Sequence, residues 1–272
     1  AAIGIHDSIF VKAAAVKVSA HTLIFVGADL LIMPPAIIDS VTEILAEKGI
    51  QRHQVFYSAS HTHSSLGAWG PGIIGAEFAG KENPNVERWL TQQIVAVVTA
   101  AIADLKPAKI STGNFPIGRY TSNRLIGKSG NKNNDFSFIA LEQVGHKKAI
   151  IGSYAAHATT LNAKNLEISA DYPGYWQRKM EATDFDYAVF FAGSVGSQSP
   201  DSEGEGFDKP KFIGEALADS LKVEVSKLVY QDTISLSTIS LKIQLPEYHI
   251  RLTSELNLAT ALSEKLLPFS DH

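Results

Sequence analysis

Short apolar runs of strand length alternate in this chain with longer segments whose apolar residues recur at helical spacing. The runs at 9–18, 22–33 and 53–60 predict buried strands. Between the last two, residues 34–49 start with proline, keep helical spacing and stop at a glycine, which predicts a helix. A chain that alternates in this way buries its apolar faces by covering a sheet with helices. The pattern therefore predicts an α/β fold with a mixed β-sheet flanked by helices.

The rest of the chain continues this alternation. We expect strands near 109–114, 136–143, 147–156 and 187–193, a strand or hairpin over 232–245, and helices over 85–107, 210–229 and 253–267. Residues 115–135 are polar and rich in Gly and Asn, and a connection of that length is usually functional or disordered.

The composition argues against several classes of function. The formal net charge is −4 and the Lys and Arg residues are scattered, which argues against nucleic-acid binding. No apolar run approaches the roughly 18 residues that a membrane span requires. The chain has no cysteine, so disulfides, thiolate catalysis and Cys-ligated zinc are excluded. Any transition metal must therefore be bound by His, Asp, Glu or Tyr.

Three of the predicted strands run directly into polar residues. The first ends at His61-Thr62-His63, the second ends at His157, and the third ends at the polar stretch 194–200. Ligands of open α/β sheets bind beyond the carboxyl ends of the strands. Three such ends would bring residues about a hundred positions apart into one pocket, so we expect the active site there.

The histidines at these strand ends suit a metal ion. Residues at i and i+2 of an extended segment face the same side, so His61 and His63 can both point into the crevice. Solvated loop histidines would explain this pair alone, and a hydrogen-bonded core histidine would explain His157 alone. Catalytic zinc typically takes three protein ligands and keeps a position for water. Together the three residues make a zinc site plausible.

Four motifs along the chain resemble those of one protein family. They are "SASHTHSS", the Asn123-Arg124 pair, "AAHATTLNAKNLEISADYPGYW" and "FFAGSVGSQSP", and their order and spacing resemble the neutral/alkaline, non-lysosomal ceramidase family. The openings "GIHDSIFVKA" and "TLIFVGADLL" look like the first strands of the same family. The likeness therefore covers nearly the whole chain.

The resemblance implies a zinc-dependent amidohydrolase that cleaves ceramide to a sphingoid base and a fatty acid. In that family's pattern, His61 and His157 would be zinc ligands, and His63 would face the substrate as a hydrogen-bonding or proton-handling partner. Arg124 would lie beside the cleft and contact the substrate, and Ser199 would assist as the serine of the family hexapeptide. The implied partner is a lipid-like N-acyl substrate of the ceramide class, and the implied location is secreted or periplasmic.

Two departures from the family pattern limit this reading. Gly196-Ser197 stands where the family has Gly-Asp, so an expected carboxylate is missing. The Glu of a Pro-Gly-Glu element and the later Tyr that complete the family's zinc site have no counterpart before His272. We therefore expect residues 1–272 to be a single catalytic domain that lacks its C-terminal part, and a further segment of the same protein to complete the site.

Two other functions stay open at this point. One is a zinc hydrolase of the same fold that acts on a different amide or an ester. The other is a non-catalytic binding relative, which the missing carboxylate and the missing Glu and Tyr would favour.

Overall fold

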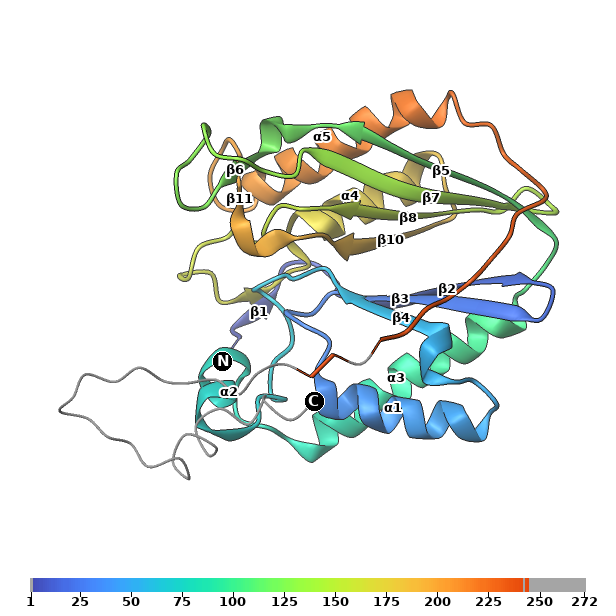
Figure 1. The fold of residues 1–272 in the computed structure, drawn as a ribbon. Coiled ribbons are helices and arrows are strands. Elements are labelled where there is room, and N and C mark those ends of the chain that lie inside the picture. The colour runs from blue at the N-terminus through green and yellow to red at the C-terminus, as the bar shows by residue number, and fades with distance from the viewer. Residues whose placement is uncertain (1, 242, 245–272) are drawn as a thin grey trace. The chain divides into compact units, whose positions relative to one another are not determined.

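A computed structural model describes residues 2–241, 243 and 244 (Figure 1). The chain forms two compact units. Of the described residues, the first contains 2–33, 54–65 and 96–237, and the second contains 34–53, 66–95, 238–241, 243 and 244. All the residues that the sequence analysis assigns to the site belong to the first unit, so the fold of that unit positions the site.

A four-stranded mixed sheet forms the centre of the first unit (Figure 1). Its strands lie in the order β10 (Tyr187–Ala192), β8 (Lys148–Tyr154), β7 (Asp135–Gln143) and β5 (Ala108–Pro116). The pair β10–β8 is parallel, and the pairs β8–β7 and β7–β5 are antiparallel. Two helices, α4 (Asp171–Thr183) and α5 (Asp208–Val225), pack against one another and cover one face of this sheet.

The core between this sheet and its helices is aromatic. Phe136, Tyr154 and Phe190 project from the strands and meet Trp176 of α4 and Leu217 of α5, all of them nearly inaccessible to solvent. Burying one such apolar side chain contributes about 1.5–3 kcal/mol to folding. The sheet is therefore a rigid base for the loops that leave the ends of its strands.

A second sheet in the same unit has three strands. They are β2 (Val11–Val18), β3 (His21–Ala28) and β4 (Val55–Ala59), with β2–β3 antiparallel and β3–β4 parallel. Ala14 of this sheet packs with Val189 and Phe191 on the open face of the four-stranded sheet. Gly27 has no side chain at a place where a Cβ would collide with Val189, so glycine permits the close approach of the two sheets.

Short strands link the loops of the first unit. β1 (Gly4–Ile5) pairs with β9 (Glu167–Ile168) in parallel, and β6 (Thr121–Asn123) pairs with β11 (Gln198–Pro200) in antiparallel fashion. The single 3₁₀ turns are η1 (Arg52–Gln54), η2 (Gly118–Tyr120) and η3 (Val195–Ser197).

Helices make up the second unit. They are α1 (Pro35–Glu47), α2 (Gly72–Ala79) and the first part of α3 (Pro84–Ala103), whose last turns belong to the first unit. α1 begins at Pro35, whose fixed φ suits the first position of a helix, and it buries Ile37, Val41 and Leu45. Within the described part of the chain, every helix is too short or too polar to cross a bilayer.

The structure confirms the expected α/β class and the mixed sheet flanked by helices. The predicted strand or hairpin over 232–245 is wrong for the residues described there, because only Gln231 bridges to the edge strand β5, and Ile239 and Leu241 are exposed. The predicted helix 253–267 lies outside the described residues. The sequence analysis missed α4, whose pattern is interrupted by Pro173 and Gly174, yet a proline is tolerated in the first turn of a helix.

Candidate metal and catalytic site

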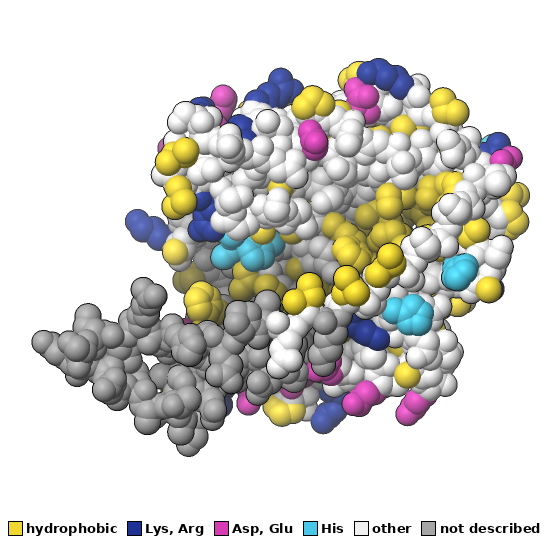
Figure 2. Space-filling view, in the orientation of Figure 1, with side chains coloured by type: hydrophobic (Ala, Val, Ile, Leu, Met, Phe, Trp, Pro, Cys, Tyr) yellow, Lys and Arg dark blue, Asp and Glu magenta, His cyan; other side chains and the backbone are white. Residues whose placement is uncertain are grey.

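Three histidines meet at the carboxyl ends of β4 and β8. His61 and His63 follow β4, and His157 follows β8. One ligand atom from each lies within 4.8 Å of the others. The Nε2 atoms of His61 and His157 are 3.0 Å apart, and those of His157 and His63 are 3.2 Å apart. Figure 2 shows histidine side chains grouped at the surface. The residues that the sequence analysis expected to converge do converge.

Backbone carbonyls set the tautomers of two of these rings. His61 donates from Nδ1 to the carbonyl of Leu31 at 2.6 Å, and His157 donates from Nδ1 to the carbonyl of Val195 at 3.0 Å. A ring whose Nδ1 carries the proton presents a lone pair at Nε2. Two lone pairs 3.0 Å apart repel unless a cation or a proton lies between them. This donor set therefore fits a metal ion, with the outer nitrogens anchored as metal-binding histidines usually are.

His63 differs from the other two rings. Its side chain is exposed, and no backbone carbonyl among the described residues accepts from its Nδ1. Its backbone N–H donates to the carbonyl of Ala158 at 3.4 Å, which joins the two histidine loops. His63 can therefore turn toward a substrate more freely than His61 or His157.

The backbone around His61 is strained. His61 has a φ of 64°, in the left-handed region that non-glycine residues rarely adopt. The next residue, Thr62, is fully buried, and its hydroxyl donates to the carbonyl of Ser169 at 2.8 Å. Such strain costs of order 1–3 kcal/mol and persists only where the surrounding contacts hold the backbone in that conformation. Here the buried threonine holds the turn that directs His61 inward.

Two residues fix the loop that carries His157. The backbone carbonyl of Gln198 accepts from the His157 N–H at 3.1 Å, and its buried side chain donates to the carbonyl of Ala155. The carboxylate of Asp171 accepts from the Thr160 N–H at 3.1 Å and from the Thr160 hydroxyl at 2.7 Å. The sequence analysis gave Gln198 no role of its own, although it lies in the polar stretch 194–200 that follows a predicted strand.

Asp29 is a further residue that sequence reasoning missed. Its buried carboxylate accepts from the Phe10 N–H at 3.0 Å and from the Gln177 side-chain amide at 3.1 Å. Burial raises its pKa to about 6. Asp29 anchors the end of β3, two residues before the Leu31 carbonyl that orients His61.

Burial and the neighbouring charges favour the neutral imidazole at two of the histidines, His63 and His157. Partial burial, followed by the charges of His61, His157 and Arg124, lowers the pKa of His63 to about 4. Burial also lowers the pKa of His157, and His61 and Arg124 act in the same direction. Neutral imidazole is the form that binds metal, so the site is prepared for an ion at neutral pH.

Arg124 lies beside the histidines, and Ser199 lies on the neighbouring strand. The Arg124 N–H donates to the carbonyl of Ser197 at 2.9 Å, and its guanidinium donates to the carbonyl of Gly196 at 3.2 Å. Ser199 pairs with Ser122 across β11 and β6. The histidines and Arg124 thus share one electrostatic environment, whereas the hydroxyl of Ser199 makes no hydrogen bond within the described part of the chain.

Known proteins similar to this chain share one description. A model of the family described as neutral/alkaline non-lysosomal ceramidase, N-terminal, matches residues 1–205. The structure of neutral ceramidase from Pseudomonas aeruginosa matches with a TM-score of 0.72 and 22% identity, over 80% of this chain and 39% of that chain. A structure of a ceramidase complexed with C2 matches with a TM-score of 0.73 and 21% identity, over 81% and 39%. No curated protein sequence matches significantly. At this identity the structures show a shared fold, and the chain spans about two fifths of their length.

Proposed function

Since this chain belongs to the neutral/alkaline non-lysosomal ceramidase family, we propose that it carries part of the active site of a zinc-dependent ceramide hydrolase. The reaction cleaves the N-acyl amide bond and releases a sphingoid base and a fatty acid. One observation carries the proposal. The Nε2 atoms of His61 and His157 face one another at 3.0 Å while each Nδ1 is held by a backbone carbonyl.

His61 and His157 would hold the ion through Nε2. Zinc is the transition metal that nitrogen donors of this kind bind most often in hydrolases. When bound, it would supply a Lewis acid that polarises the acyl carbonyl and makes a water molecule more acidic. The chain's own part is to orient the two rings so that each Nε2 presents its lone pair to the ion, which the carbonyls of Leu31 and Val195 do.

His63 would act as a hydrogen-bond donor to the oxyanion that develops on the acyl oxygen. A pKa of about 4 makes its imidazole a weak base at neutral pH, so donation suits it better than proton abstraction. The Arg124 guanidinium, held by the Gly196 carbonyl, would add positive charge to the same region. Ser199 would assist from the adjoining strand.

In the proposed reaction, a water oxygen bonds to the acyl carbon and the carbon–nitrogen bond breaks. The nitrogen takes a proton and leaves as the amine of the sphingoid base, while the acyl group leaves as the carboxylate. His63 would stabilise the tetrahedral oxyanion between these two events.

We also propose that residues outside these 272 supply the remaining ligands of the metal ion. The location we propose for the protein is secreted or periplasmic. The matched structures are more than twice as long as the region they share with this chain, and neutral histidines alone do little to balance the charge of the ion. The isolated chain should therefore bind zinc weakly and be inactive. Calorimetry with zinc tests this, and a submicromolar Kd would show that these 272 residues already contain a full site.

The full activity is tested with the full-length protein, purified without chelator. We expect stoichiometric zinc and ceramide turnover that is lost on chelation and restored by zinc. A panel of other N-acyl amides and esters run in parallel would identify a different substrate class. Zinc far below stoichiometry, or no turnover of any member of the panel, would overturn the proposal.

A further inference from the structure

Two large apolar side chains project into solvent from the loop after β6. Leu125 is 93% exposed and Ile126 is 65% exposed. Single exposed apolar residues are common on protein surfaces, but two consecutive ones at a loop tip form a small continuous apolar surface. In Figure 1 this loop extends away from the sheet.

The tip is a well-built turn. The side-chain oxygen of Asn123 accepts from the N–H groups of Leu125 and Ile126 at 2.9 and 3.2 Å. The backbones of Asn123 and Gly127 exchange hydrogen bonds at 3.1 and 3.0 Å, and Gly127 has a φ of 70° that glycine adopts without strain. This network presents both apolar side chains outward and pre-organises them for contact.

The turn lies next to the histidine site. Arg124, directly before Leu125, is fixed by the carbonyls of Ser197 and Gly196, and its charge lowers the pKa of His63. The apolar tip therefore belongs to the same end of the sheet as the histidines. A surface that contacts the tip would be close to the site.

The lysine nearest the tip already has an acidic partner, and the guanidinium of Arg124 is turned to the Gly196 carbonyl. Lys128, in the same loop, forms an ion pair with Asp201 at 2.9 Å, and Glu203 also acts on it. An anionic membrane would gain little from a lysine that already has a partner, and it would be repelled by Glu203. Apolar contact is thus the larger attraction that this surface offers.

We propose that Leu125 and Ile126 insert into the interfacial region of a zwitterionic lipid bilayer and bring the histidine site to lipid. Binding of this kind scales with the apolar area buried, so two residues give weak and reversible attachment. That this contact brings the site to a lipid substrate rests on the proposed function. The attachment itself does not, because it needs neither metal nor turnover.

The absence of cysteine allows a direct test on the 272-residue chain. The variant Leu125→Cys is labelled with an environment-sensitive fluorophore and mixed with phosphatidylcholine vesicles that contain no substrate. The matched control is Val144→Cys, which is 72% exposed and follows β7 at the opposite end of the sheet. We expect a blue shift and quenching by brominated lipid at position 125 only. Equal signals at both positions, or none at position 125, would overturn the proposal.

A second pair of variants tests the driving force. Leu125→Glu combined with Ile126→Glu should lower partitioning to these vesicles by about tenfold or more, and Val144→Glu should leave it unchanged. Added salt should have little effect. A requirement for anionic lipid, or loss of binding in salt, would contradict an apolar contact with a zwitterionic surface.

Turnover separates this inference from the proposed function. In the full-length protein, the Leu125→Glu, Ile126→Glu variant should retain turnover of a short, water-dispersed N-acyl amide and lose turnover of the same amide in vesicles. Equal loss on both substrates would contradict the inference. Absence of turnover in the unmodified protein would contradict only the proposed function, since the fluorescence experiment still decides attachment.

Discussion

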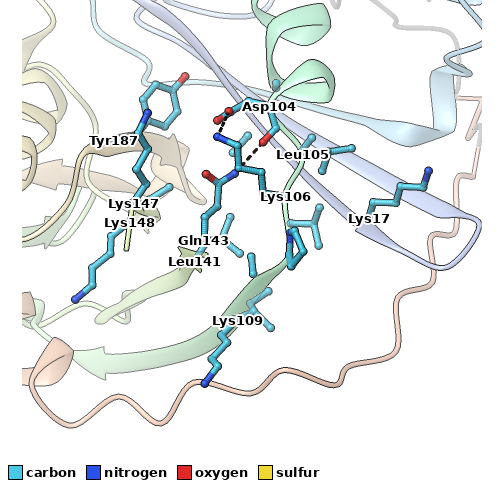
Figure 3. A pocket seen from close by; sticks show the side chains of 18 of the residues that line it. Lys17, Asp104, Leu105, Lys106, Lys109, Leu141, Gln143, Lys147, Lys148 and Tyr187 are labelled. Atoms are coloured by element: carbon cyan, nitrogen blue, oxygen red, sulfur yellow. Dashed lines mark hydrogen bonds and ion pairs between the residues drawn. The ribbon is translucent and has the colours of Figure 1, made fainter. Parts of the chain in front are cut away.

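The two ends of the four-stranded sheet differ in what their loops do with polar side chains. At the carboxyl ends of β8 and of the neighbouring β4, three imidazoles converge on one point and backbone carbonyls anchor two of them. At the other end, a cavity of about 1180 Å³ is lined largely by small apolar residues and ringed by lysines. Figure 3 shows the side chain of Lys17 pointing away from those of Lys109 and Lys148, and Lys106 forms an ion pair with Asp104 at 2.9 Å.

This difference teaches that cavity volume alone does not identify a reactive site. A large apolar pocket is a common first hypothesis for a binding site. Here the proposed reactive site lies at the histidine end of the sheet. Hydrogen bonds to backbone carbonyls hold His61 and His157 with their Nε2 lone pairs facing one another, although these repel. Among the described residues that line the cavity, the lysine ammonium groups have no comparable set of buried anchors.

The largest expected effect is the loss of metal binding at the histidine end of the sheet. His61→Ala and His157→Ala should each lower zinc affinity by more than about 100-fold, because each removes a proposed ligand. His146→Ala is the matched control, since His146 is exposed in the turn between β7 and β8 at the other end. Calorimetry with zinc on the three variants of the full-length protein checks this. Retention of zinc by His61→Ala together with loss of zinc by His63→Ala would reverse the assignment.

Removal of the His63 imidazole should lower the rate of turnover without lowering zinc binding. His63→Ala should retain zinc and lower kcat by about 100-fold, because it removes the proposed hydrogen bond to the oxyanion. The measurement is turnover and metal content of the full-length protein. The same two quantities should be unchanged in His146→Ala. A variant His63→Ala with normal turnover would remove His63 from the mechanism.

Loss of the buried carboxylate should loosen the His157 loop. Asp171→Asn should lower the free energy of unfolding by about 2 kcal/mol, because an amide nitrogen would face N–H donors that a carboxylate now satisfies. Asp186→Asn, at an exposed residue that accepts from the Lys148 N–H, should cost less than about 1 kcal/mol. Urea unfolding of both variants at pH 7.5 compares them. Equal costs would mean that the two ends are equally tightly built.

The smallest expected effect is a pH dependence of stability. The pKa of His63 is about 4 in the folded chain and about 6.5 when unfolded, so the unfolded chain takes up the proton first. The contribution of His63 to stability is therefore complete above about pH 6.5 and is lost as the pH falls toward 4. His63→Ala should flatten this part of the profile, and His146→Ala should not. An imidazole of His63 that titrates near 6.5 by NMR would contradict the expectation.

Local patterns were sufficient for most of the fold and for the histidines. The apolar spacing of β2, β3 and α1 is visible in the sequence because it repeats within a few residues. The His-x-His pair and His157 were recognisable because each follows a buried apolar run. The prediction was wrong where a strand-like pattern lacked a neighbouring strand to pair with. This is so for the described residues of 232–245, none of which lies in a strand.

Sequence alone thus determined the α/β class, the strands that carry the site and the histidines at their ends. Only the tertiary structure decided that the carbonyls of Leu31 and Val195 orient the rings, that Gln198 and Asp171 hold the loop, and that Leu125 faces solvent. The physical reason is separation along the chain. Side-chain periodicity depends on near neighbours, whereas a hydrogen bond between residues 30 to 38 positions apart exists only after the sheets have packed.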